Sequence, residues 1–225
     1  FTSLIDRSIT EIEIPKSITR IGSGAFNGCN KITGTVIIPE NVTRIEQAAF
    51  LACSGITELK LSNNLKYIGG NALAETSSLE RLVMPASITT FPSTMAARSG
   101  FVEFIAKGEA SQVGPAAFQS CHNCIKYDFT NCTKVPILNN TNAFNGINAD
   151  CKIYVPASLY DKWIVATNWA EYADHIVAVG GDSEGLSMTL SSDGTHYRVT
   201  GMGTCTDTEL IIPSEYNGIP ITVLD

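Results

Sequence analysis

Few side chains in this sequence are spaced for chemistry, and the clearest group is the stretch CHNC at residues 121–124. Two cysteines separated by two residues are typical of half a zinc site, and His122 between them would add a nitrogen ligand. A closed zinc site needs four ligands, however, and no second pair of cysteines has a suitable spacing. The sequence therefore predicts no metal site.

The three histidines, His122, His175 and His196, lie beside no nucleophile motif. A histidine activates a serine or cysteine when the fold brings the two side chains within hydrogen-bond distance. No glycine-rich phosphate loop follows a predicted strand, and GGD at 180–182 lacks the spacing of the nucleotide-binding motifs. We expect no enzymatic activity and no cofactor, although a triad assembled from distant residues stays an alternative.

The composition describes a folded chain with a net negative charge. Its 225 residues are 44% hydrophobic, which is enough for a large core. The 15 basic and 22 acidic residues give a net charge of −7, the wrong sign for covering phosphates. No apolar run approaches the roughly 18 to 20 residues of a membrane-spanning helix, and the first residues do not read as a secretion signal. We expect neither a nucleic-acid partner nor a membrane-spanning segment.

A repeat with a period of about 23 residues organises most of the chain. ITEIEIPKSITRIGSGAFNGC at 9–29 recurs as ITGTVIIPENVTRIEQAAFLAC at 32–53. Further copies begin at residues 56, 79, 101 and, more loosely, 124. Such a period is typical of a solenoid with leucine-rich-repeat geometry.

The first copy shows how one coil is built. Ile12 and Ile14 point inward from a short predicted strand, because they alternate with glutamates that face solvent. Pro15 ends this strand, since proline lacks the N–H that a parallel ladder needs, and Pro39 and Pro85 take matching positions. An Ala-Phe pair then fills the back of the coil.

The repeat resembles the BspA-type leucine-rich repeat, I-x-x-I-x-I-P-x-x-V-x-x-I-G-x-x-A-F-x-x-C, most closely over residues 9–55. Later copies depart from it: Leu73 and Ala96 replace the phenylalanine, Thr76 and Ser99 the cysteine, and Lys107 and Thr130 the proline. The inward ladder continues through Ile12, Val36, Leu59, Leu82, Phe104 and Tyr127. The resemblance implies a bacterial or protozoal surface protein whose curved parallel-sheet solenoid is displayed outside the cell and used for binding.

The repeat also explains the cysteines better than a metal site does. Cys121 has the same position in its coil as Cys29 and Cys53. Cys124 has the first strand position, which Ile9 and Leu79 hold in other copies. Both residues of CHNC are therefore predicted to be small buried hydrophobic side chains.

The repeat ends after residue 150, where a last strand precedes two predicted helices. Ser158 with Asp161, and Asn168 with Glu171, have the spacing of capping boxes. The aromatic and apolar residues of this segment would cover the open end of the core: Trp163, Trp169, Tyr172 and Ile176. We expect residues 1–179 to form one array with a helical cap from about residue 151.

The remaining residues are expected to open a second unit. GGDSEG at 180–185 has the composition of a linker, and LSMTLSSDGTHYRVTGMG after it alternates as a β-hairpin does. Ile212, Pro213, Ile221 and Leu224 then follow the order of a fresh repeat, so 186–225 is predicted to hold a hairpin and the start of a truncated second array. The chain is expected to be a monomer, or to self-associate weakly through that truncated repeat.

The outward strand positions form two columns. The charges of the first column alternate in sign from Glu58 to Lys126, so the column is expected mostly to neutralise itself: Glu11, Thr35, Glu58, Arg81, Glu103, Lys126 and Lys152. The second column, Glu13, Ile37, Lys60, Val83, Ile105, Asp128 and Tyr154, contains apolar residues where polar ones would be expected. We therefore take Ile37, Lys60, Val83, Ile105 and Tyr154 as a candidate ligand face. The alternative is that β-branched residues are there because they suit strands.

The sequence thus predicts an α/β leucine-rich-repeat solenoid with a parallel sheet, short helical or turn backs and a C-terminal helical cap. The first functional hypothesis is a non-enzymatic, surface-displayed module that recognises a protein or glycan, as in adhesion or host interaction. The second is a structural spacer or stalk in a larger cell-surface protein. A specific ligand for the array would favour the first. An extracellular or cell-surface location follows from the resemblance alone.

Overall fold

The computed structural model describes residues 8–179, 186–203, 212, 215–216 and 219–224. The chain divides into two compact units, Phe1–Val179 and Gly180–Asp225. We refer to them as the first and the second unit.

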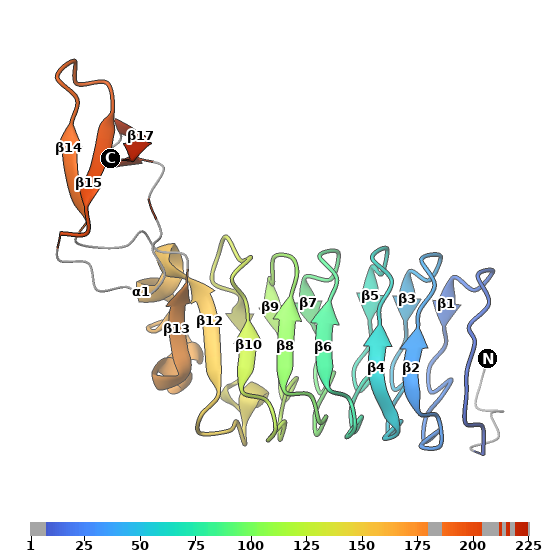
Figure 1. Ribbon diagram of the computed structural model, residues 1–225. Coiled ribbons are helices and arrows are strands. Elements are labelled where there is room, and N and C mark those ends of the chain that lie inside the picture. The colour runs from blue at the N-terminus through green and yellow to red at the C-terminus, as the bar shows by residue number, and fades with distance from the viewer. Residues whose placement is uncertain (1–7, 180–185, 204–211, 213–214, 217–218, 225) are drawn as a thin grey trace. The chain divides into compact units, whose positions relative to one another are not determined.

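The first unit is a solenoid in which one longer strand of each coil joins a single parallel sheet (Figure 1). The sheet contains β2 (Gly34–Ile37), β4 (Ile56–Lys60), β6 (Arg81–Met84), β8 (Glu103–Ala106), β10 (Lys126–Asp128), β12 (Lys152–Pro156) and β13 (Ile176–Val179). The strands lie in the order of the sequence, so each coil stacks on the preceding one. The predicted parallel-sheet solenoid is confirmed.

A second, shorter strand in each coil builds two further sheets. The first consists of β1 (Arg20–Ile21), β3 (Arg44–Ile45) and β5 (Tyr67–Ile68), and the second of β7 (Thr90–Phe91), β9 (Gln112–Val113) and β11 (Ile137–Leu138). The second residue of each short strand is buried, whereas the first is exposed or half-buried. This segment supplies the apolar residues that break strict alternation in the sequence.

Both ladders loosen at the same junction between coils. β4 and β6 share a single register pair, Glu58 with Arg81, whereas β6 and β8 stay in register from Arg81 to Met84. On the other side of the coils, β5 and β7 belong to separate sheets. Figure 1 shows the wider spacing between β4 and β6. Strand pairing is thus reduced on both sides of the junction between the third and fourth coils.

The backs of the coils are turns. Residues with left-handed backbone recur in pairs four positions apart: Gly24 and Gly28, Ala48 and Ala52, Asn71 and Glu75, Thr94 and Arg98, Ala116 and Ser120. These turns stack through backbone hydrogen bonds, for example from Phe26 N to Ala49 O at 2.8 Å and from Phe50 N to Ala72 O at 2.9 Å. One 3-10 helix, η1 (Thr141–Phe144), lies in the last back.

Thr94 holds one of these left-handed positions, with φ of 54°. A β-branched residue is strained there, so Thr94→Gly should raise the free energy of unfolding by about 1 kcal/mol. Urea denaturation measures the change. Thr89→Gly is the control, because Thr89 is exposed and is not among the residues with positive φ. That variant should be destabilised by about 0.5 to 1 kcal/mol, and equal shifts in both variants would contradict the strain.

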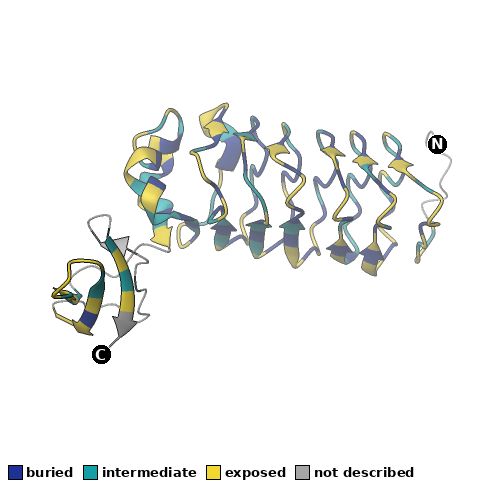
Figure 2. Ribbon diagram, turned by 90° about the horizontal axis from the view of Figure 1, so that it is seen from above, coloured by how far each residue is buried: buried dark blue, intermediate teal, exposed yellow. Residues whose placement is uncertain are grey.

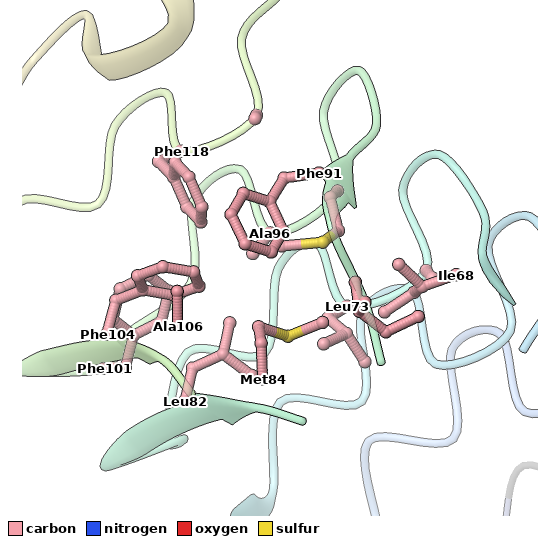
Figure 3. Packing of buried hydrophobic residues seen from close by; sticks show 14 of the residues in the cluster. Ile68, Leu73, Leu82, Met84, Phe91, Ala96, Phe101, Phe104, Ala106 and Phe118 are labelled. Atoms are coloured by element: carbon pink, nitrogen blue, oxygen red, sulfur yellow. The ribbon is translucent and has the colours of Figure 1, made fainter. Parts of the chain in front are cut away.

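Aromatic rings fill the middle of the core. Phe104 lies 4.6 Å from Phe118 and 5.3 Å from Phe91, measured between ring centroids. At the loosened junction the side chain of Met84 reaches toward Leu73 of the preceding coil (Figure 3). All five side chains are buried. The flexible thioether keeps the core packed where the coils are further apart.

The first coil departs from the prediction. Residues 8–19 form no strand, and Ile12 is half-buried. The sheet therefore begins at β2, and the strand predicted around Ile12 and Ile14 is wrong. Thr33 N still donates to Thr10 O at 3.2 Å. A coil at the end of the described stack has a neighbour on one side, so fewer hydrogen bonds hold its backbone extended.

The segment after β12 forms short helical turns in place of the two predicted capped helices. These are η2 (Ala157–Leu159), α1 (Tyr160–Trp163) and η3 (Trp169–His175), and β13 then pairs with β12. The prediction of both capping boxes is wrong. Ser158 lies inside η2, and Asn168 has φ of 65° and caps no N–H; its side chain donates to Leu138 O at 2.6 Å.

The second unit contains a four-stranded sheet in the order β14-β15-β17-β16. β14 (Ser187–Leu190) pairs antiparallel with β15 (Tyr197–Gly201), which pairs parallel with β17 (Ile219–Leu224). β16 (Glu215–Tyr216) is antiparallel to β17. Much of the predicted second repeat, including Pro213 and 204–211, lies outside the described residues.

Candidate ligand-binding face

The strand register confirms the charged column from β2 onward, and it confirms the second column on either side of the junction between Lys60 and Val83, which are not a register pair. Thr35 pairs with Glu58, and Ile37 lies opposite Lys60. Further along, Val83 pairs with Ile105. Glu11 and Glu13 precede the sheet and do not belong to its columns.

The charged column largely neutralises itself, as predicted. Arg81 Nε lies 2.6 Å from Glu103 Oε2, and Lys126 Nζ lies 2.9 Å from Glu103 Oε1. Burial raises the pKa of the Glu103 carboxyl, but hydrogen bonds from these two cations outweigh it and lower the pKa. Thr35 Oγ1 donates to Glu58 at 2.7 Å and lowers the pKa of that carboxyl as well.

The apolar column is less exposed than the sequence indicates. Ile37 is 60% exposed, whereas Val83, Ile105 and Tyr154 are half-buried. Lys126 Nζ lies 5.5 Å from the ring centroid of Tyr154 and covers part of it. In Figure 2 the strands of the long parallel sheet are largely buried or intermediate, while turns, short strands and the helical segment carry more of the exposed colour. The expectation that all four apolar residues are exposed holds for Ile37 alone.

The face also contains a groove of about 310 Å³ at the junction between β4 and β6. Its lining combines apolar and charged side chains: Glu58, Leu59, Lys60, Leu61, Asn63, Arg81, Val83, Pro85, Ile105 and Lys107. Lys60, Val83 and Ile105 belong to the predicted face, so the structure brings three of its five residues together here. Ile37 and Tyr154 lie outside the lining. The outward columns alone do not reveal this groove.

Two other hollows lie near the last coil. One of about 390 Å³ is lined by Asn142, Asn145, Glu171 and His175 among others. The other, of about 570 Å³, lies between β11 and residues 166–169 and includes Ile137, which is 67% exposed. Neither includes a residue of the predicted ligand face.

The coil position of the cysteines holds a buried hydrogen-bond donor. Cys53 Sγ donates to Phe26 O at 3.0 Å, and Cys121 Sγ donates to Ala96 O at 3.1 Å. Thr76 and Ser99, which replace cysteine at this position, also donate hydrogen bonds, both to Leu73 O, at 2.9 and 2.7 Å. Burial raises the pKa of both thiols to about 12. The predicted burial is right, but the donor role, which explains threonine and serine here, was missed.

CHNC does not converge on one point. Cys121 and Cys124 are buried in the core, whereas His122 is exposed and its Nδ1 lies 2.9 Å from Gly146 O. Cys124 hydrogen-bonds to the thiol of Cys151, which lowers the pKa of Cys124. Among the described residues, no three His, Cys, Asp or Glu side chains are grouped so that they could hold a metal ion. No helix in the described part of the chain is long and apolar enough to cross a membrane.

Stacked coils, each contributing one strand to a parallel sheet, define a leucine-rich-repeat β-solenoid with few helices. The family model of the BspA type Leucine rich repeat region matches residues 3–125 in 6 copies, and the chain belongs to this family. The family is typically surface-associated and non-enzymatic, and its repeats act as protein-binding or structural modules.

A solved structure of a leucine-rich repeat protein from Bacteroides ovatus is similar to this chain. The two are 24% identical with a TM-score of 0.48, and the match covers 62% of this chain and 36% of that one. The match thus spans little more than a third of the solved protein. No curated protein matches the chain.

Proposed function

We propose that the first unit is a non-enzymatic binding module that recognises a protein or glycan through the face of its parallel sheet. The contact residues are Ile37, Lys60, Val83, Ile105 and Tyr154. The observation that carries the proposal is Ile37, a large apolar side chain 60% exposed on a face where Arg81, Glu103 and Lys126 are already paired. Exposed apolar side chains on a regular face favour association with a partner.

We propose that this face is displayed outside the cell, because the family is typically surface-associated. Residues 157–175 act as the cap of the array, because Trp163 and Trp169 are fully buried against the last coil and pack on Phe129. We propose that 180–185, which lie outside the described residues, link the array to a second array that 186–225 open. A purely structural spacer is the rival, favoured by the ion pairs that already satisfy Glu103.

Ile37→Glu combined with Ile105→Glu should abolish ligand binding. The purified chain of residues 1–225 is screened against a displayed random peptide library and a glycan array. A ligand retained by the wild type should bind the double variant more than about tenfold more weakly, since charged groups would replace the apolar contacts. Ile37→Glu is also measured alone, because half-buried Ile105 contributes to packing.

The matched control is Ile137→Glu with Val165→Glu. These side chains are 67% and 74% exposed and lie outside the proposed face. The control should bind as the wild type does, and circular dichroism should show each variant folded. A wild type that retains no ligand would favour the spacer. Equal loss in both variants would move the site away from the face.

A further inference from the structure

The groove between β4 and β6 differs from the rest of the sheet face in both shape and charge. Elsewhere neighbouring strands stay in register over most of their length, as β6 does with β8. Here a single register pair, Glu58 with Arg81, joins β4 and β6, and the two strands are spaced more widely than their neighbours (Figure 1). The volume of about 310 Å³ is at the lower end of ligand pockets and has room for a few side chains.

The floor of the groove is apolar. Leu61, Val83, Pro85 and Ile105 come from four different points on three coils and face one hollow. Leu61, Val83 and Ile105 are half-buried, so a ligand would remove more of their surface from water. This favours a ligand with an apolar side chain.

The rim of the groove is cationic. Lys60, Arg81 and Lys107 contribute three positive charges, against one negative charge from Glu58. Arg81 already pairs with Glu103 at 2.6 Å, and Lys60 Nζ is 3.4 Å from Glu58. Lys107 is exposed and forms no ion pair with any described residue. Because the whole chain carries −7, this is a local reversal of its charge, and such a reversal attracts anionic groups.

From this combination we infer that the groove binds an acidic peptide segment. An apolar side chain of the segment lies on Val83 and Ile105, and a neighbouring carboxylate lies between Lys60 and Lys107. The lining offers a sugar little, since it contains one amide side chain, Asn63, and no aromatic ring. The inference rests on the proposed function and names the chemistry of the partner.

Lys60→Glu with Lys107→Glu tests the inference on the whole chain. Wild type and variant each select from the same unbiased library of displayed peptides. Wild-type binders should be enriched in aspartate or glutamate beside an apolar residue. They should bind the variant more than about tenfold more weakly, since its rim would repel the carboxylate. Raising the salt concentration should weaken wild-type binding as well.

Lys31→Glu with Lys134→Glu is the charge-matched control, because both lysines are exposed and lie outside the lining. It should keep wild-type affinity. The selected peptides could lack an acidic bias, bind Lys60→Glu with Lys107→Glu normally and fail to bind Ile37→Glu. That result would overturn the acidic-peptide site in the groove and leave the proposed face standing. Selection of no peptide binder at all would overturn binding of an acidic peptide in the groove, and a ligand found on the glycan array would then leave the proposed face standing. Equal loss in the control would also overturn the groove.

Discussion

Phe104→Ala is expected to lower the free energy of unfolding of the first unit by about 3 to 5 kcal/mol. The ring of Phe104 is fully buried and packs against Phe118 of its own coil, Phe91 of the preceding coil and Phe129 of the following one. Its removal leaves a cavity that other rings, held by their own coils, cannot fill. Urea denaturation followed by tryptophan fluorescence measures the loss, because both tryptophans belong to this unit.

Ile105→Ala is the matched control for that experiment. Ile105 is the next residue of β8, points to the outer face and is half-buried. Its truncation removes fewer core contacts and should cost less than about 1.5 kcal/mol. A loss below about 1 kcal/mol for Phe104→Ala would mean that the ring is not central to the core.

The repeat pattern predicted the inward residues because every coil uses the same positions for its core. Val36, Leu59, Leu82 and Phe104 recur at one phase of the repeat, and all four are buried. Buried apolar residues at a fixed period specify the register of stacked strands, since a slip of one residue would turn them to solvent. The outward columns follow from the same register.

The groove was not predictable from that pattern. Lys60 and Val83 hold equivalent positions in successive coils, and nothing in their residue types shows that β4 and β6 separate before reaching them. Periodicity gives the order of the coils but not the distance between them.

The capping boxes failed for a different reason. Asn168 and Glu171 have the right spacing, but the pattern describes a competition among local hydrogen bonds only. In the fold, the side chain of Asn168 bonds to Leu138 O on the outer edge of β11. The capping box requires the side-chain oxygen of Asn168 to accept from a helix N–H, whereas its amide nitrogen donates to a sheet-edge carbonyl distant in sequence.

Trp169 contacts the chain next to the same edge. Trp169→Ala should lower the free energy of unfolding of the first unit by about 3 to 5 kcal/mol. The indole is fully buried, packs on Phe129, Phe144 and Trp163, and donates from Nε1 to Pro136 O at 2.7 Å. The variant would lose the ring packing as well as the hydrogen bond to Pro136 O, just before β11. Urea denaturation, followed by the fluorescence of the remaining tryptophan, measures the change.

A pair of phenylalanine variants separates the hydrogen bond from the packing. Trp169→Phe keeps an aromatic ring but leaves Pro136 O without its donor. The lost hydrogen bond should lower the free energy of unfolding by about 1 to 3 kcal/mol, in addition to the effect of the smaller ring. Trp163→Phe makes the same change in a ring that is also fully buried, yet Trp163 Nε1 has no hydrogen-bond partner among the described residues. Removing an unsatisfied buried N–H relieves a desolvation penalty, which offsets part of the lost packing. Trp169→Phe should therefore be the less stable variant, and the opposite order would show that the bond to Pro136 does not hold residues 157–175 on the last coil.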